Sequence, residues 1–186
     1  MKKKLSEMSL EELWQLFPIF LTEHQDCWKE WYLEEESFLK KVLPPIERIS
    51  HIGSTAVSSI WAKPIIDILV EIKKGSSLLG YKDAIVNNGY ISMSQSEDRI
   101  SFNKGYTEDG FAERVFHLHL RYAGDNHELY FRDYLMEHPR EAKEYEELKL
   151  KLWKEYEHDR DGYTNAKAEL VRKYTEEARR LYEGRY

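Results

Sequence analysis

Cysteine and positive charge are both scarce in this sequence. Cys27 is its only cysteine, which excludes an intrachain disulfide and a cysteine-rich metal site. The 28 Lys and Arg residues are outnumbered by 34 Asp and Glu residues, and the formal net charge is −6. Proteins that bind duplex nucleic acid usually carry a positive surplus that neutralises the phosphates. The charge balance therefore disfavours a duplex partner.

Long apolar runs are absent as well. The longest stretch, within residues 65–70, is interrupted by Asp67 and is far shorter than the roughly 20 residues that cross a bilayer. We therefore expect no transmembrane helix and no membrane partner. The basic start at residues 1–4 resembles the beginning of a secretory signal, but Glu7 and Glu11 lie where an apolar stretch would have to follow. Together with the single cysteine, this favours a cytoplasmic protein.

The composition is that of a folded protein with one core. Of the 186 residues, 41% are hydrophobic and 13% are aromatic, which argues against disorder. The length suits one domain over residues 1–186. Within it, the patterns predict N-terminal helices over 1–45, a mixed sheet over 46–122 and C-terminal helices over 123–186, which is an α+β architecture. The sequence does not indicate an oligomeric state.

Apolar periodicity and capping signals predict the individual elements. Ser9 and Glu12 have the spacing of a capping box, and the helix that they begin keeps helical spacing to about Leu21. A second helix starts near Asp26 and ends before the proline pair at 44–45. The other predicted helices span about 78–86, 125–137, 140–158 and 163–182, and the predicted strands span 46–52, 64–72, 90–94, 99–104 and 115–122. We expect residues 159–162 to be a break between the last two helices.

The most informative stretch is the end of the first predicted strand. Gly53, Ser54 and Thr55 follow it directly, and successive backbone N–H groups at such a turn form a concavity that suits phosphate. Asp67 lies on the next strand, where its carboxylate can hold a divalent metal against that phosphate. A tight turn with one hydrogen-bonded strand aspartate explains the same residues without a ligand. We predict that the turn faces a cleft lined by Asp67.

Two histidines alternate with apolar residues on a later predicted strand. Phe116, Leu118 and Leu120 form the core face, so His117 and His119 share the opposite face. These imidazoles can bind a metal together with Asp67 or contact a phosphate, and a solvated or hydrogen-bonded sheet face is the structural alternative. We predict that this strand lies beside the Asp67 strand, with one histidine in the same cleft.

Several basic residues are candidates for an anion-binding rim. The four singled out are Lys63, Lys104, Arg114 and Arg132. Arg132 is the strongest of these, because a guanidinium binds phosphate with two hydrogen bonds. Lys149 and Lys167 can face the same site, although the Lys/Glu runs around them are also typical of solvated helix faces.

Residues 51–72 as a whole resemble the GrpB family of the nucleotidyltransferase superfamily. Further matches to that family follow in order, at Phe102, Lys104-Gly105, His117-Leu118-His119, residues 131–135, His138-Pro139, Tyr145, Lys149, Tyr163, Lys167 and Ala178. The resemblance covers nearly the whole chain. It implies a nucleotidyltransferase-like mixed β-sheet flanked by helices, with N-terminal helices and a helical C-terminal cap.

The resemblance also implies a chemistry. Active members of the superfamily carry two acids one residue apart on the strand after the Gly-Ser turn, and a third acid on a later strand. Asp67 matches the first acid, but Leu69 stands at the second position. Glu71 is roughly 13 Å further along the strand. His117 or His119 would take the third position. A nucleoside triphosphate, as substrate or ligand, and Mg²⁺ or Mn²⁺ are the implied partners.

Three functions remain open at this stage. The first is transfer of a nucleoside monophosphate to an unknown acceptor, with Asp67 as the catalytic residue. The second is a non-catalytic module that binds a nucleotide or another phospho-ligand. The third is a metal-dependent hydrolase that uses Asp67, His117 and His119. Leu69 separates the first from the second, because two-metal chemistry loses one of its carboxylates there.

Overall fold

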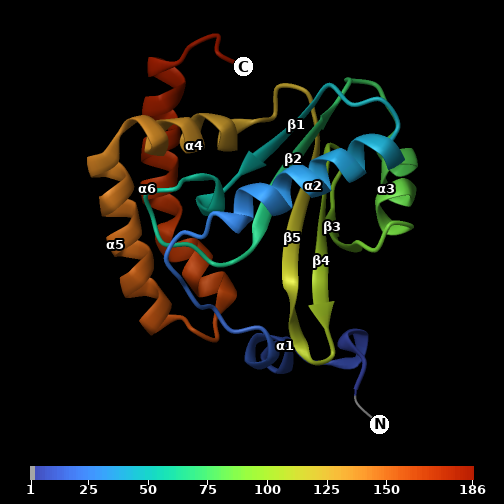
Figure 1. Ribbon diagram of the computed structural model, residues 1–186, viewed down its shortest axis with the longest axis horizontal. Coiled ribbons are helices and arrows are strands. Elements are labelled where there is room, and N and C mark those ends of the chain that lie inside the picture. Colours follow the sequence, from blue (N-terminus) through green and yellow to red (C-terminus); the bar gives the residue numbers. More distant parts are fainter. Residues whose placement is uncertain (1–2) are drawn as a thin grey trace.

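A five-stranded sheet with helices on both faces forms the centre of the molecule (Figure 1). The computed structural model describes residues 3–186, so the first two residues of the basic N-terminal tip lie outside the described residues. The strands are β1 (Arg48–Ile52), β2 (Ile66–Ile72), β3 (Ile91–Gln95), β4 (Arg99–Thr107) and β5 (Gly110–Tyr122). The α-helices are α1 (Leu10–Leu16), α2 (Cys27–Val42), α3 (Leu78–Val86), α4 (His127–Glu137), α5 (Pro139–Glu155) and α6 (Arg160–Leu181).

The sheet is mixed, as the sequence predicts. Its strand order is β1-β2-β5-β4-β3, with β2 and β5 parallel and the other neighbours antiparallel. The parallel pair sets Asp67 opposite His117 and Leu69 opposite His119. The predicted adjacency of the aspartate and histidine strands is thus confirmed. Since side chains alternate between faces along a strand, all four of these residues lie on the same face.

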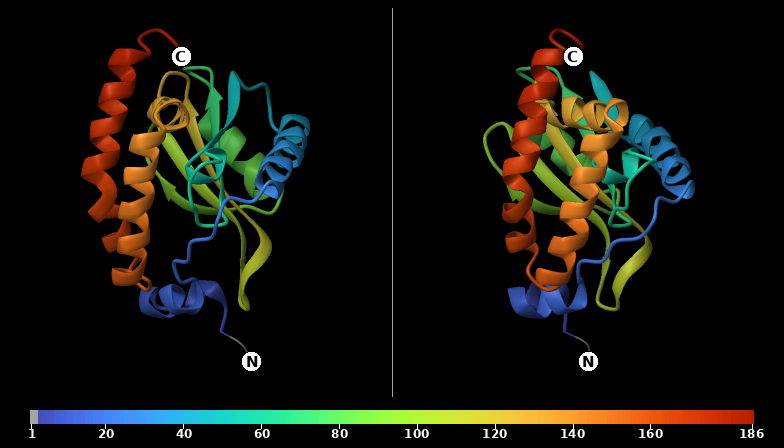
Figure 2. Two further views of the ribbon diagram at one scale, coloured as in Figure 1. Left: turned by 60° about the vertical axis from the view of Figure 1, so that its left-hand side comes forward. Right: turned by 90° about the vertical axis from the view of Figure 1, so that its left-hand side faces the viewer.

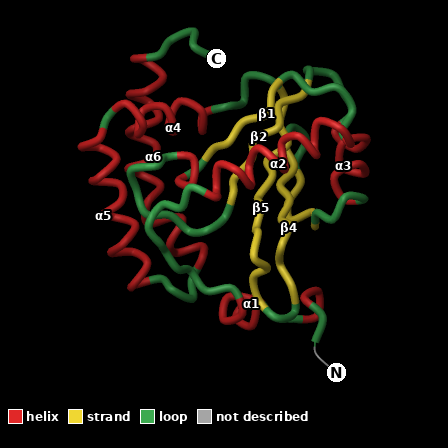
Figure 3. The backbone as a smooth tube through the Cα atoms, viewed as in Figure 1, coloured by secondary structure: helices red, strands yellow, loops and turns green. Residues whose placement is uncertain are grey.

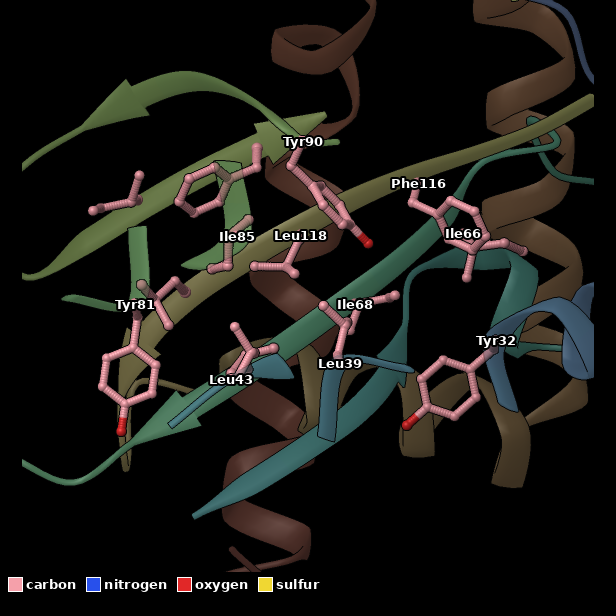
Figure 4. Packing of buried hydrophobic residues seen from close by; sticks show 14 of the residues in the cluster. Tyr32, Leu39, Leu43, Ile66, Ile68, Tyr81, Ile85, Tyr90, Phe116 and Leu118 are labelled. Atoms are coloured by element: carbon pink, nitrogen blue, oxygen red, sulfur yellow. The ribbon is translucent and has the colours of Figure 1, made fainter. Parts of the chain in front are cut away.

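The opposite face carries the main hydrophobic core. Helices α2 and α3 cover it, and Figure 4 shows Leu39 of α2 and Ile85 of α3 in this core. Trp28 of α2 belongs to the same cluster. These side chains pack against the inward face of three strands, formed by Ile66, Ile68, Val70, Ile100, Phe102, Phe116, Leu118 and Leu120. Each of these strand residues is almost fully buried. The alternation that buries Leu118 on this side therefore turns His117 and His119 toward the C-terminal helices.

The C-terminal helices lie over the Asp67 face, and α5 and α6 run side by side there (Figure 2). They pack through an apolar cluster that includes Leu135, Tyr145, Tyr174 and Ala178. Leu129 of α4 also contacts the sheet, in a small cluster with Ile52 and Leu69. Helices α4, α5 and α6 therefore form a second layer, which covers the face of the sheet that carries Asp67.

Two predicted boundaries are wrong for local reasons. The first helix ends at Leu16 rather than near Leu21, because Pro18 pushes Phe17 out of the α region, at φ −122° and ψ 64°. The chain then continues as a loop in which Thr22 pairs with Ala62 (Figure 3). Conversely, the predicted break at 159–162 is mostly helical, since the Asp159 side chain accepts a hydrogen bond from Gly162 N and caps α6.

Other predictions at the ends of elements hold. Ser9 accepts from the backbone of Glu12, whose carboxylate accepts from Ser9 N, so the capping box is formed. Helix α2 begins directly after Asp26, close to the predicted start, and it ends before the proline pair. None of the helices within residues 3–186 has the length and apolar character that a membrane span requires.

Candidate functional site

The turn after β1 lies directly against Asp67. Ile52 pairs with Asp67 across the antiparallel β1–β2 ladder, and Gly53 follows with φ 72°. A Cβ atom on Gly53 would lie 2.5 Å from Asp67 Oδ2, so only glycine lets the backbone pass here. The chain then forms one 3-10 turn, Ser54–Ala56. The predicted turn facing the Asp67 cleft is confirmed by this geometry.

The two hydroxyls of the turn have different roles. Thr55 is 2% exposed, and its Oγ1 donates to Ile65 O and lies 2.9 Å from His51 Nε2. Its hydroxyl therefore fixes the shape of the turn, although the sequence placed Thr55 among the phosphate ligands. Ser54 is more exposed, and its Oγ accepts a hydrogen bond from Lys149 Nζ at 3.1 Å. Of the two side chains, Ser54 is the one whose hydroxyl faces a cation.

Both predicted histidines converge on the aspartate. His117 Nδ1 is 3.4 Å and His119 Nε2 is 3.7 Å from Asp67 Oδ1. Burial by itself would raise the pKa of Asp67, but the imidazole N–H groups of His117 and His119 outweigh it and hold that pKa well below its usual range. Burial also lowers the pKa of His117 despite the nearby carboxylate. Asp67 is thus an anion beside a neutral His117 at pH 7.

A hydrogen-bonded chain supports His117 from the other side. His117 Nε2 is 2.8 Å from Tyr106 Oη, which in turn accepts from Arg160 Nη1 at 3.0 Å. Because His117 Nδ1 donates to Asp67, its Nε2 is the acceptor for the Tyr106 hydroxyl. The first turn of α6 is in this way connected to the carboxylate on β2.

The position of the second acid is closed to solvent. Leu69 is fully buried under Leu129 and packs with Ile52. Glu71 is also buried, where its Oε1 accepts from Gly124 N and Asn126 Nδ2. It therefore anchors the loop after β5 and does not face the cleft.

The donor set does not fit a two-metal centre. Of the acids in the superfamily pattern, Asp67 is the one whose carboxylate lies in the cleft. Two imidazole nitrogens face its Oδ1, and its Oδ2 lies close to Gly53. Within residues 3–186, no group of three or more His, Cys, Asp and Glu side chains converges as metal ligands. We therefore derive no catalytic step through a metal ion at Asp67.

Four basic side chains from different elements line the same pocket, which has a volume of about 440 Å³. They are Lys63 from the loop before β2, Lys149 from α5, and Arg160 and Lys167 from α6. The Tyr163 ring holds two of them, with Lys63 Nζ 5.3 Å and Lys167 Nζ 4.6 Å from its centre. Across the described residues, no carboxylate lies within ion-pair distance of any of the four.

Burial and mutual repulsion weaken proton binding by two of these lysines. Desolvation, followed by the charges of Lys167 and Arg160, lowers the pKa of Lys63 to about 7. Desolvation and the charge of Lys167 likewise lower the pKa of Lys149 to about 7. Lys149 is 2% exposed, and Nζ donates to the carbonyl of Trp61 as well as to Ser54. The pocket therefore concentrates more positive charge than the carboxylate of Asp67 can balance.

Three of the four basic residues predicted for the anion-binding rim do not line this pocket. Lys104 is on the α2 face of the sheet, where Nζ pairs with Glu35 at 2.7 Å and lies over the rings of Phe38, Tyr90 and Phe116. The reason is alternation, since Lys104 is two residues from Phe102 and opposite Phe116. The exposed Arg114 pairs with Glu34.

Arg132 lies behind the turn and is not a lining residue of the pocket. Its guanidinium donates to His51 O at 2.9 Å, to Asp133 and to Tyr186 Oη. Arg132 therefore holds the end of β1 in place, and two of its N–H groups donate to a single carboxylate oxygen, Oδ1 of the neighbouring Asp133.

Among the lining residues, Arg160 and Tyr163 were missed by the sequence reasoning as members of a site. The sequence predicts a break at residues 159–162. However, aspartate is a favoured N-cap residue, so Asp159 is itself a signal that a helix starts there. A helix that begins at Arg160 places Arg160, Tyr163 and Lys167 at spacings of three and four residues, on one face.

Comparison with known proteins agrees with this fold. The model of the GrpB protein family matches residues 18–177, so the chain belongs to the GrpB family. It is 32% identical to the UPF0157 protein YqkA of Bacillus subtilis over 98% of this chain, and it spans 54% of that protein, about half its length. The crystal structure of the conserved protein GrpB from Enterococcus faecalis superposes with a TM-score of 0.76 at 30% identity, covering 88% of this chain and 99% of that one.

A more distant structure shares the fold. The Cid1 poly (U) polymerase, solved with bound MgATP, superposes with a TM-score of 0.52 at 12% identity, over 72% of this chain and 44% of that one. At this identity the likeness concerns the fold alone, which is the nucleotidyltransferase fold. The α+β class with its nucleotidyltransferase-like fold and the resemblance to the GrpB family, both indicated by the sequence, are confirmed.

Proposed function

We propose that this protein binds a nucleotide by its phosphate groups, in the pocket between the Gly53–Ser54 turn and the α5–α6 helices. The single observation that carries the proposal is the group of four basic side chains without a carboxylate partner, Lys63, Lys149, Arg160 and Lys167. Lys149 is buried and the other three are partly buried, and a buried cation normally pairs with an anion, because an uncompensated charge costs several kcal/mol. A bound phosphate chain supplies that anion.

The turn supports the same ligand. Gly53 brings successive backbone N–H groups to the edge of the pocket, and Ser54 Oγ is already hydrogen-bonded to Lys149. A phosphate at this point would receive backbone, hydroxyl and ammonium donors from three directions. Hydrogen bonds of this charge-assisted kind contribute about 1.5–3 kcal/mol each.

Binding fits the site better than the two catalytic alternatives. Nucleotidyl transfer by the two-metal route needs a second carboxylate, and Leu69 is buried in its place. A metal-dependent hydrolase built on Asp67, His117 and His119 needs three ligands that converge on one ion, whereas both imidazoles face the same carboxylate oxygen, Asp67 Oδ1, at 3.4 and 3.7 Å. We therefore propose the non-catalytic nucleotide-binding module.

Calorimetric titration with ATP tests the proposal, with adenosine as the ligand that lacks phosphates. We expect ATP to bind, adenosine not to bind, and Lys149→Met to weaken ATP binding by about tenfold or more, the loss of one charge-assisted hydrogen bond. Lys151→Met is the matched control, because Lys151 is exposed on the same helix. Equal binding of ATP and adenosine would contradict a phosphate site.

A further inference from the structure

The pocket is already positively charged before any metal ion enters it. When the lysines are protonated, the four cations exceed the charge of the anion Asp67 by three formal charges. Glu128 also lines the pocket, but its carboxylate pairs with Arg121 at 2.6 Å. A triphosphate chain, with roughly one to two negative charges per phosphate, matches this charge without a counterion.

The carboxylate that would hold a metal has close neighbours at both oxygens. Two imidazole nitrogens face Asp67 Oδ1 at 3.4 and 3.7 Å, and Gly53 lies so near Oδ2 that a Cβ atom there would be 2.5 Å away. Mg²⁺ is bound in proteins by one or two carboxylates together with phosphate oxygens, at close to ideal octahedral geometry. To coordinate it, Asp67 would have to break the contacts that position it.

Two lysines, Lys63 and Lys149, line the same pocket as the Gly53–Ser54 turn and Asp67. Lys149 Nζ is fixed beside the turn by its bonds to Ser54 Oγ and Trp61 O. Lys63 is close enough to Asp67 and to Lys149 for their charges to interact. A divalent cation beside Asp67 would therefore be repelled by ammonium groups that already neutralise phosphate.

We propose that Lys63 and Lys149 take over the role of the divalent cations, so that a nucleoside triphosphate binds here without metal. This inference rests on the proposed function. It assigns the ligand class as a free, uncomplexed polyphosphate ester, in a fold whose distant relative was solved with a magnesium-bound nucleotide.

The direct test is titration of the whole chain with ATP in excess EDTA and again in excess MgCl₂. We expect binding in EDTA at least as tight as in MgCl₂, because Mg²⁺ removes negative charge from the ligand. Binding that requires MgCl₂ would overturn this inference and leave the proposed function standing. No binding in either buffer would overturn the proposed function itself.

Two substitutions sharpen the test in EDTA. Lys63→Met should weaken ATP binding by about tenfold, and MgCl₂ should not restore it. Asp67→Asn should strengthen ATP binding several-fold, since it removes the negative charge beside the phosphates. A metal-dependent site gives the opposite result for Asp67→Asn, namely loss of binding. Inorganic tripolyphosphate should compete with ATP, and AMP should compete much more weakly, because fewer of the cations are neutralised.

Folding must be separated from binding in these variants. Circular dichroism and the midpoint of urea unfolding report whether each variant keeps its structure, and Lys151→Met serves again as the exposed control. If Asp67→Asn fails to fold, the comparison of EDTA with MgCl₂ in the unmodified protein still decides the proposal.

Discussion

The backbone of Gly53 passes so close to the carboxylate of Asp67 that no larger residue fits between them. A Cβ atom there would lie 2.5 Å from Asp67 Oδ2, and φ of 72° independently favours glycine. This contact joins the end of β1 to the neighbouring strand β2. It explains in physical terms why a glycine stands where the first strand ends, and why the phosphate turn and the aspartate form one unit.

Gly53→Ala is therefore expected to be both unstable and unable to bind ATP. Strain at positive φ together with the clash should lower the free energy of unfolding by about 1–3 kcal/mol, measured by urea denaturation. Gly80→Ala is the matched control, because Gly80 lies in α3 with nothing within 4 Å of an added Cβ. It should gain about 0.5–1 kcal/mol. Equal stability changes in the two variants would contradict the close contact.

Leu69→Asp restores the acid pattern of the superfamily in sequence but not in structure. Leu69 is fully buried beneath Leu129, so a carboxylate there should lower the free energy of unfolding by about 3–5 kcal/mol. Leu69→Met should cost less than about 1.5 kcal/mol. Urea titration measures both. A stable Leu69→Asp variant that binds Mg²⁺ tightly would show that the second acid position is open after all.

Stability should rise with pH above neutrality. In the folded protein the pKa values of Lys63 and Lys149 are about 7, against 10.5 for an ordinary lysine. Between these values the unfolded chain binds more protons, so the free energy of unfolding increases with pH, by at most about 1.4 kcal/mol per pH unit for each lysine. Below pH 7 both lysines are charged in both states and the effect vanishes.

Urea unfolding at pH 7, 8 and 9 measures this slope. Lys149→Met removes one of the two groups and should flatten it, whereas Lys151→Met should leave it unchanged. A slope in the unmodified protein that is zero or negative over this window would contradict the burial of unpaired ammonium groups.

Lys104 provides a test of which face of the sheet is the site. Lys104→Met should leave ATP affinity unchanged, because Lys104 lies on the α2 face with Glu35. It should lower the free energy of unfolding by about 1–3 kcal/mol, since Glu35 loses a charged hydrogen-bond partner and keeps Tyr90. Loss of ATP binding without loss of stability would place the ligand on the other face.

Local patterns account for the part of the site that lies on the sheet. Strand alternation placed His117 and His119 opposite the core, and the abrupt end of a strand at Gly53 located the turn. The same rule applied to Phe102 would have put Lys104 on the core face. Lys104 was predicted to bind an anion because it is basic, although its position on the strand places it on the core face.

The helical half of the site could not be predicted in the same way. Lys149 and Lys167 were recognised as residues that face either solvent or the site, and spacing alone does not decide between these. Their position depends on how α5 and α6 dock on the sheet through Tyr145, Tyr174 and Ala178. That packing is a tertiary contact between segments far apart in the sequence. The approach of Lys149 to Ser54, 95 residues away, follows from it.

A crystal structure of the protein with ATP, at a concentration that saturates it in titration, would show directly where the phosphates bind. We expect the triphosphate to lie between the Gly53–Ser54 turn and Lys149, with Lys63 and Lys167 on its other oxygens. A triphosphate bound elsewhere on the molecule, with Lys149 still bonded only to Ser54 and Trp61, would contradict this expectation.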